Sequence, residues 1–251
     1  AWLDEAGGAG LFDSMRRELA SRGLTGAGAL FIAAGSSAAP FALALARIAR
    51  GRSCVMMTPS AIPASSFDYA VVPWHDHPRP SPNVLVTLGA PNSIFPDELK
   101  RRGWELAERN PPSEESRGRW GLMIGGDDAN YSISEEWISM ALPPILSAAE
   151  GLGIDLYITT SRRTSAGAEE VLSLLAPLYP SVRMLLLASK EDFNPVPGML
   201  GLCSRLFVTE DSVSMVSEAI TAGREVFLLR VGRRGGARSA LQDATSWLVR
   251  R

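Results

Sequence analysis

The segment RLFVTEDSVSMVSEAITAGREVFLL, residues 205–229, contains one complete repeating unit of the fold. Residues 205–208 form a short, largely apolar run of the kind found in buried parallel strands. Residues 212–222 are typical of a helix, and Gly223 follows at the position where a left-handed residue ends many helices. Residues 225–229 form a second apolar run. A strand, a helix and a strand in this order predict two parallel strands joined by a crossover helix.

The same alternation extends through the rest of the chain. Short apolar runs predict further strands at residues 29–34, 53–57, 69–73, 84–88, 120–124, 155–159 and 183–188. Longer segments predict helices at residues 11–22, 38–50, 95–109, 135–152, 166–178 and 239–249. Ser36 or Ser37 is expected to cap the second of these helices. Strands that alternate with helices are typical of an α/β protein built on parallel sheets.

A polar stretch, NPPSEESRGR at residues 110–119, interrupts the alternation. It combines prolines, serines and glutamates without an apolar residue, which is typical of a linker. We therefore expect two Rossmann-like domains, residues 1–112 and 113–235, with parallel sheets that face each other across a cleft. The last segment, residues 236–251, is expected to be a helix that packs back on the first domain.

Composition excludes several classes of protein. The formal net charge of −2 provides no broad basic surface, so we expect no nucleic-acid binding. Cys54 and Cys203 are too few for a disulfide framework or a zinc site, which favours a reducing compartment. No apolar run of about 18 residues predicts a transmembrane segment. The start lacks both a signal-peptide pattern and an initiator Met. We expect a cytoplasmic protein, at most peripheral to the inner membrane, and the sequence alone leaves open whether it begins inside a longer protein.

The loops that follow the strands are the candidate binding sites, because ligands of open parallel sheets bind beyond the carboxyl ends of the strands. The loop after residues 205–208 is the strongest candidate. Asp211 or Ser212 is expected to cap the next helix, whose free N–H groups would attract a phosphate. Ser214 and Glu218 share one helix face, where a carboxylate is placed to accept hydrogen bonds from ribose. A capped helix without any ligand would have the same pattern.

A second candidate loop follows the strand at residues 155–159. It contains Thr160, Ser161, Arg162 and Arg163. Guanidinium groups bind phosphate oxygens in pairs and stay charged, and the neighbouring hydroxyls suit the same ligand. The alternative is a solvated surface turn.

The glycine pair Gly125-Gly126 follows the strand at residues 120–124 and permits either a sharp turn or the close approach of a ligand. It is not a GxGxxG fingerprint, and no such fingerprint occurs in the chain. The chain also lacks a P-loop and a GxSxG elbow. These absences disfavour dinucleotide enzymes, NTPases and serine hydrolases.

The first half of the chain offers two further candidates. Gly35 and Ser36 end one strand and lead into a helix. His75, Asp76 and His77 form a polar loop in which a histidine beside a carboxylate suits proton transfer. Two histidines and one carboxylate in a short loop are a weak metal-binding pattern, so we expect no metal. A polar loop without chemistry is an equal alternative.

Several motifs occur here in the order of one known family. They are GSSAAPFALALARIA, MTPS, FDYAVVPWHDH, NVLVTLGAPN, LMIGG, ITTSRRT and VTEDSVSMVSEAITAG. This set resembles the bacterial and plant proteins named after the plant mitochondrial fission factor "elongated mitochondria". Bacterial members are often labelled predicted nucleoside-diphosphate-sugar epimerases. The similarity extends over residues 30–229. Two departures are the glycine- and His/Asn/Gln-containing stretch missing before Leu11, and Val196 where the family has an aromatic residue.

The resemblance implies a glycosyltransferase-B fold and a site for a nucleotide-diphosphate sugar. The last motif is similar to the donor-site helix of the peptidoglycan transferase that adds N-acetylglucosamine to a lipid-linked precursor. The implied nucleotide-binding residues are Gly125, Gly126, Thr160, Ser161, Arg162, Arg163, Glu210, Asp211, Ser212, Val213, Ser214, Met215 and Glu218. The implied acceptor-side residues are Gly35, Ser36 and Asn194, with His75 and Asp76 as the catalytic pair.

Three functions stay open. The first is a metal-independent glycosyltransferase with no cofactor, which transfers a sugar from a nucleotide sugar to a hydroxyl acceptor; analogy with the peptidoglycan transferase suggests a lipid-linked one. The second is a scaffold that has lost turnover, since the plant relative is known for recruiting a dynamin-type partner. The third is the epimerase of the older labels, which would require a tightly bound NAD and a Tyr/Lys pair that we cannot assign.

Overall fold

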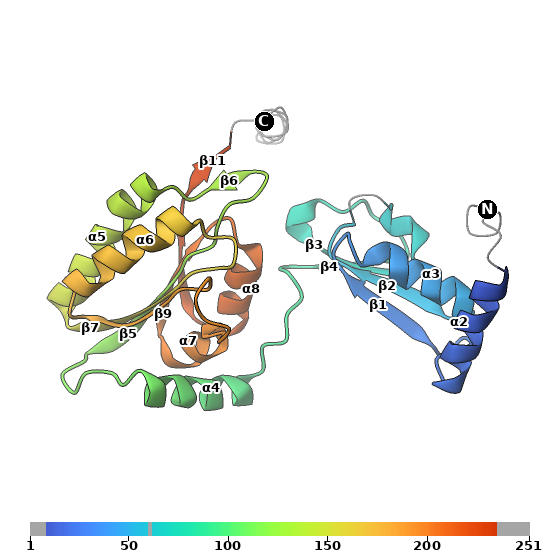
Figure 1. Ribbon diagram of the computed structural model, residues 1–251, viewed down its shortest axis with the longest axis horizontal. Coiled ribbons are helices and arrows are strands. Elements are labelled where there is room, and N and C mark those ends of the chain that lie inside the picture. The colour runs from blue at the N-terminus through green and yellow to red at the C-terminus, as the bar shows by residue number, and fades with distance from the viewer. Residues whose placement is uncertain (1–8, 60–61, 235–251) are drawn as a thin grey trace. The chain divides into compact units, whose positions relative to one another are not determined.

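The computed structural model describes residues 9–59 and 62–234 (Figure 1). Contacts between residues divide the chain into two compact units, Ala1–Pro91 and Asn92–Arg251. Each unit contains one open parallel sheet, so the predicted α/β class with two parallel sheets is confirmed. The helix expected at residues 239–249 lies outside the described residues.

The first unit has a four-stranded sheet. Its strands lie in chain order, β1 (Leu30–Ala34), β2 (Arg52–Met56), β3 (Tyr69–Pro73) and β4 (Val84–Thr87), and every neighbouring pair is parallel. Its described helices are α2 (Ala9–Ser21), α3 (Ala39–Ala49) and the short 3₁₀ helices η1 (Ala64–Ser66) and η2 (Trp74–Asp76).

Helix α3 and one face of this sheet enclose the core of the first unit. Ala39, Val55, Phe67, Ala70 and Val72 are all buried there. The serine cap expected for α3 is wrong: the helix begins at Ala39 after Ala38, and no side chain accepts from its first turn. Proline in that first turn has no N–H to satisfy, which reduces the need for a cap.

The second unit has a five-stranded parallel sheet in the order β10-β9-β5-β7-β8. These strands are β5 (Gly118–Met123), β7 (Ile154–Thr159), β8 (Val182–Leu186), β9 (Arg205–Thr209) and β10 (Glu225–Leu229). The short strands β6 (Tyr131–Ser132) and β11 (Gly232–Arg233) pair with each other as an antiparallel ribbon.

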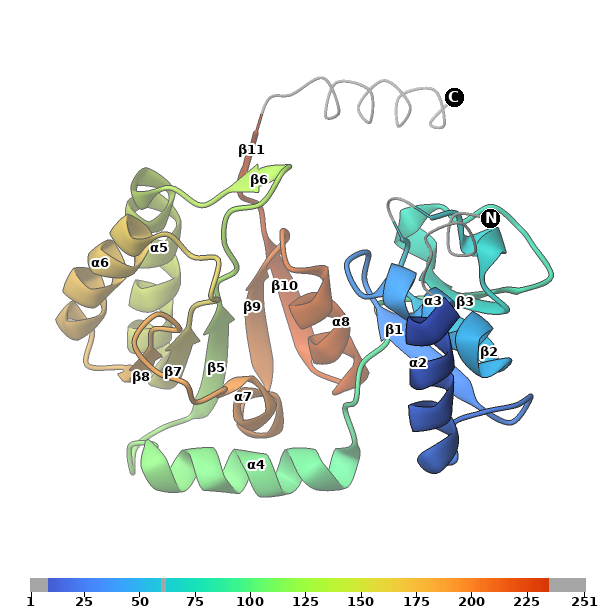
Figure 2. The same ribbon diagram turned by 45° about the vertical axis from the view of Figure 1, so that its right-hand side comes forward.

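Helices cover both faces of this second sheet (Figures 1 and 2). They are α4 (Pro96–Arg109), α5 (Glu135–Leu152), α6 (Ala166–Leu175), which continues as the 3₁₀ turn η3 (Ala176–Leu178), α7 (Val196–Leu202) and α8 (Val213–Thr221). Helices α5 and α6 pack on one face around Leu142 and Leu172, whereas α4, α7 and α8 enclose a second core around Leu106, Met199 and Ala219. The sheet is therefore a doubly wound layer between two helical layers.

Helix α4 belongs to the second unit because it packs closely on α7. A Cβ on Gly201 would lie 1.9 Å from the carbonyl oxygen of Leu99, and one on Gly103 would lie 2.8 Å from the carbonyl carbon of Gly201. The glycines thus let the two backbones approach directly. The boundary given by the contacts therefore lies after Pro91, whereas the proline-rich stretch had suggested residue 112.

Candidate functional site

The carboxyl ends of three neighbouring strands meet at a switch point in the second sheet. From β5 the strand order continues through β7 to β8 on one side, whereas β9 and β10 lie on the other side. Connections diverge at such a point and leave a crevice where ligands bind. Residues 125–130 follow β5, residues 160–164 follow β7 and residues 210–212 follow β9. We call these three segments the switch-point loops.

Gly125 and Gly126 hold the loop after β5 against the other two. The Gly125 amide donates to Thr209 Oγ1 over 2.7 Å, and the Gly126 amide donates to Asp211 Oδ2 over 2.9 Å. A Cβ on Gly125 would lie 2.1 Å from Asp211 Oδ2, and one on Gly126 would lie 2.1 Å from the carbonyl carbon of Arg163. Both positions therefore require glycine, because Asp211 and the Arg163 backbone leave no room for a side chain.

Arg163 is turned toward the protein. Its Nη2 donates to Asp211 Oδ2 over 2.9 Å, and the Asp211 side chain is fully buried. Its Nη1 donates to the carbonyl oxygens of Gly126 and Asp127 over 3.2 and 3.3 Å. Asp211 Oδ1 has no hydrogen-bond partner. The Arg163–Asp211 ion pair thus ties the three switch-point loops together.

The rest of the loop after β7 divides into buried and exposed groups. Thr160 is buried; its hydroxyl donates to Glu169 Oε1 over 2.6 Å and accepts from the Ala188 amide over 2.8 Å. Ser161 Oγ accepts from the Arg163 amide over 3.1 Å. Arg162 is exposed, and its guanidinium makes no hydrogen bond or ion pair with the described part of the chain. Arg162 is therefore the arginine of this loop whose guanidinium is free of contacts with the described residues, whereas Arg163, which is also exposed, has several.

The first turn of α8 lies beside this loop cluster without a side-chain cap. Ser212 occupies the N-cap position, but its hydroxyl accepts no hydrogen bond from the helix. The expectation that Asp211 or Ser212 caps the helix is therefore wrong, because the Asp211 carboxylate is taken up by Gly126 and Arg163. Uncapped N–H groups at a helix start form a favourable site for an anion.

The other residues predicted to bind a ligand near the start of α8 differ in their contacts and in their exposure. Glu210 Oε1 accepts from the Val231 amide over 3.1 Å, which directs it to the end of β10. Val213 and Ser214 are exposed in the first turn, whereas Met215 packs against the core shared by α4, α7 and α8. Val213 and Ser214 are therefore the exposed residues of this group, whereas Glu210 and Met215 are partly buried.

Glu218 lies further along α8 and lines a pocket of about 170 Å³. Asn194, expected on the acceptor side, lines the same pocket as Glu218, which was expected to bind the nucleotide. Burial raises the pKa of the Glu218 carboxyl. The Asn194 amide oxygen accepts from the Val196 amide over 3.1 Å. Within residues 9–59 and 62–234, the Glu218 carboxylate and the Asn194 amide nitrogen make no hydrogen bond, so both can bind a polar ligand.

The other side of this pocket was missed by sequence reasoning. It is formed by the start of α4 and the residues before it, namely Ser93, Ile94, Phe95, Glu98 and Leu99. Their order in the chain had placed them in the first domain. The sequence predicts a helix at residues 95–109, but it does not reveal the unit on which that helix packs.

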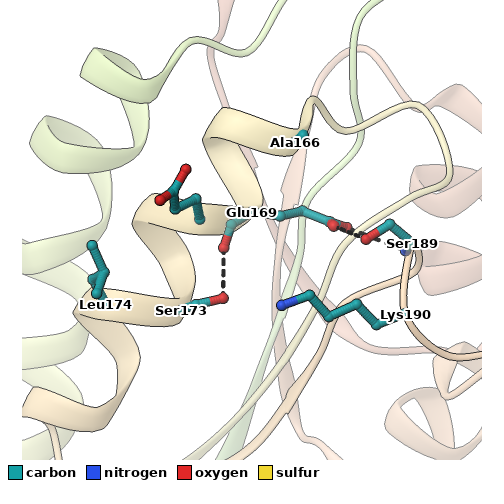
Figure 3. A pocket seen from close by; sticks show the side chains of 7 residues that line it. Ala166, Glu169, Ser173, Leu174, Ser189 and Lys190 are labelled. Atoms are coloured by element: carbon teal, nitrogen blue, oxygen red, sulfur yellow. Dashed lines mark hydrogen bonds between the residues drawn. The ribbon is translucent and has the colours of Figure 1, made fainter.

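A second pocket, of about 340 Å³, lies between α6 and the loop after β8 (Figure 3). Glu169, Ser189 and Lys190 contribute to its wall. The Glu169 carboxylate is buried and accepts hydrogen bonds from Thr160 and from the hydroxyl of Ser189. Both carboxylate oxygens are therefore engaged within the protein, and the arrangement fixes the loop after β8 against α6.

The candidates of the first unit lie at the carboxyl edge of its sheet. Gly35 follows β1 with a φ of 77°, a conformation that favours glycine. His75 and Asp76 lie in η2, directly after β3. Asp76 Oδ2 accepts from the Thr58 hydroxyl over 2.7 Å, whereas His75 Nε2 is 3.7 Å from Asp76 Oδ1, too far for a hydrogen bond. Asp76 is thus oriented by Thr58. Ser36 follows Gly35 at the same edge.

None of the helices within the described residues combines the length and apolar character of a membrane-spanning helix.

Comparison with solved structures finds alpha,alpha-trehalose-6-phosphate synthase from Burkholderia multivorans at 13% identity and a TM-score of 0.48, over 87% of this chain and 60% of that chain. A trehalose-6-phosphate synthase studied with bisubstrate glycomimetics matches at 14% identity and a TM-score of 0.41, over 87% and 62%. The chain spans less than two thirds of either structure. No curated protein matches.

A family comparison matches residues 3–244, nearly the whole chain, to the model described as Mitochondrial fission ELM1. This match confirms the family that the sequence motifs predicted. The chain belongs to the Mitochondrial fission ELM1 family.

Proposed function

We propose that the second unit binds a nucleotide-diphosphate sugar at the switch-point loops and that the protein is a glycosyltransferase. The observation that carries the proposal is the uncapped start of α8 at the switch point, together with the exposed Arg162 in the loop after β7, which is tied to the start of α8 by the Arg163–Asp211 pair. Unpaired N–H groups, the helix dipole and an exposed arginine together provide an electrostatic site for a diphosphate.

Glu218 and Asn194 extend this site toward the nucleoside. A carboxylate without a protein partner accepts hydrogen bonds from two adjacent hydroxyls, and the free amide nitrogen of Asn194 donates one. The apolar residues of the same pocket, including Leu99 and Val196, would contact the ring carbons. A ribose combines these features. The similarity of residues 208–223 to a donor-site helix supports the same assignment.

In the proposed reaction, the acceptor hydroxyl oxygen forms a bond to the anomeric carbon of the sugar while the bond from that carbon to the diphosphate breaks. The hydroxyl proton passes to a general base, for which the first unit offers Asp76, oriented by Thr58, and the neighbouring His75 as candidates. Arg162 and the N–H groups of α8 stabilise the leaving nucleoside diphosphate, which carries the developing negative charge.

A thermal-shift screen tests this proposal. Uridine, guanosine, cytidine and thymidine diphosphates and their sugars are added to the full chain, and ligands that bind the folded state raise the melting temperature. The proposal predicts a shift with at least one nucleotide that is lost in Glu218→Ala. Absence of a shift with every nucleotide would support the scaffold hypothesis instead.

A further inference from the structure

We propose that Asp211 is a positioning residue: it holds Arg163 away from the ligand and leaves the start of α8 open, while Arg163 neutralises the Asp211 charge. This inference rests on the proposed diphosphate site. It assigns to Arg163 an indirect electrostatic role in place of the direct phosphate contact that the sequence suggested.

The position of Asp211 in the chain makes its contacts unusual. It directly precedes the N-cap residue Ser212, and a carboxylate near this position commonly bonds the first-turn amides of the helix. Here the carboxylate accepts from the Gly126 amide and from Arg163 Nη2, both over 2.9 Å. The amides of the first turn of α8 therefore stay available to a ligand.

Most N–H groups of the Arg163 guanidinium are engaged within the protein, although the side chain is 41% exposed. Besides Asp211, it donates to the carbonyl oxygens of Gly126 and Asp127, and its Nη1 lies 3.7 Å from Asp128 Oδ2. These contacts direct the guanidinium toward Asp211 and the loop carbonyls, and they leave fewer of its five N–H groups for phosphate oxygens. The exposed Arg162 next to it has no such contacts with the described residues.

The charge balance of the site follows from this pairing. The Asp211 side chain is fully buried, and its Oδ1 has no hydrogen-bond partner. Without Arg163, a buried carboxylate would remain uncompensated next to the start of α8. A charged carboxylate within several ångströms of a bound anion would lower the affinity for that anion about tenfold or more. An uncharged ligand at the same site would feel no such repulsion.

The test uses calorimetry on the full chain with pyrophosphate as the anionic probe, a nucleoside diphosphate from the screen, and its uncharged nucleoside. Arg163→Met should weaken binding of both anions about tenfold or more and leave nucleoside binding unchanged. The double variant R163M/D211N should restore anion binding to within about threefold of wild type. If the double variant binds as weakly as Arg163→Met, Arg163 contacts the ligand directly and the inference is overturned.

Two further measurements keep the test decisive. If Arg163→Met does not fold, Asp211→Asn alone should bind pyrophosphate at least as tightly as wild type, and a tenfold loss in this variant overturns the inference. If the wild-type protein binds neither pyrophosphate nor any nucleoside diphosphate, the proposed function fails as well. Wild-type binding combined with an unaffected Arg163→Met variant contradicts only the role of Asp211.

Discussion

The backbone amide of Gly125 donates a hydrogen bond to Thr209 Oγ1 over 2.7 Å, and both residues are buried. This bond joins the ends of β5 and β9, the two strands that flank the switch point. The position of the candidate site therefore depends on a threonine that a ligand does not need to touch.

Thr209→Val should lower the free energy of unfolding by about 1–3 kcal/mol, because it keeps the side-chain shape but leaves the buried Gly125 amide without an acceptor. Urea denaturation measures the change. Thr209→Ser, which retains the hydroxyl, is the matched control and should lose less. Equal stability of the valine and serine variants would show that the bond contributes nothing.

Gly126→Ala should be strongly destabilising, since the new Cβ would lie 2.1 Å from the Arg163 carbonyl carbon. We expect a loss of more than about 2 kcal/mol by chemical denaturation. Gly151→Ala is the control, because a Cβ at Gly151 in helix α5 meets nothing within 4 Å. That substitution should be neutral or stabilise by roughly 0.5–1 kcal/mol. A tolerated Gly126→Ala would mean that the loops do not approach as closely as described.

A fragment that begins at Asn92 should unfold cooperatively, whereas a fragment that begins at residue 113 should not. The shorter fragment lacks α4 and would expose the core residues Met199 and Leu200, which lie under it. Circular dichroism during thermal unfolding distinguishes the two. A cooperative transition of equal midpoint in both fragments would place the boundary at the proline-rich stretch instead.

Glu218→Gln should stabilise the unliganded protein at neutral pH and weaken nucleotide binding. Burial raises the Glu218 pKa in the folded state, so the folded state holds the proton more tightly than the unfolded state. Wild-type stability from this group therefore falls as pH rises from the ordinary Glu pKa through the raised one. The variant should melt roughly 1–3 °C higher at pH 7 and lose this pH dependence. A lower melting temperature for the variant at pH 7 would contradict the assignment.

Local patterns predicted most of the fold. The helix expected at residues 135–152 is α5, with Ser134 as its cap through a 3.1 Å bond from the Trp137 amide. The strands expected at residues 69–73 and 225–229 are β3 and β10. Helix α7 was missed because its seven residues include Gly198 and Gly201, which lower helix propensity. Those glycines serve the close contact with α4, which a local pattern cannot reveal.

The candidate site was predicted in part. The switch-point loops were found because each combines an apolar strand with a polar or glycine-rich end. The distribution of roles among neighbouring residues could not be predicted, because it depends on partners distant in the chain. Arg162 and Arg163 look equivalent in the sequence, yet only Arg163 meets Asp211, 48 positions away. Asn194 and Glu218 likewise line one pocket with the start of α4, although these segments lie far apart in the chain.

The most direct test of the account is isothermal titration calorimetry of nucleoside diphosphates into the full chain and its Arg162→Ala variant. Lys100→Ala, which removes an exposed cation on α4, is the control for a general loss of positive charge. The account predicts that wild type and Lys100→Ala bind one nucleoside diphosphate alike, and that Arg162→Ala binds it about tenfold or more weakly. Equal binding by all three proteins, or by none, would contradict a diphosphate site at the switch-point loops.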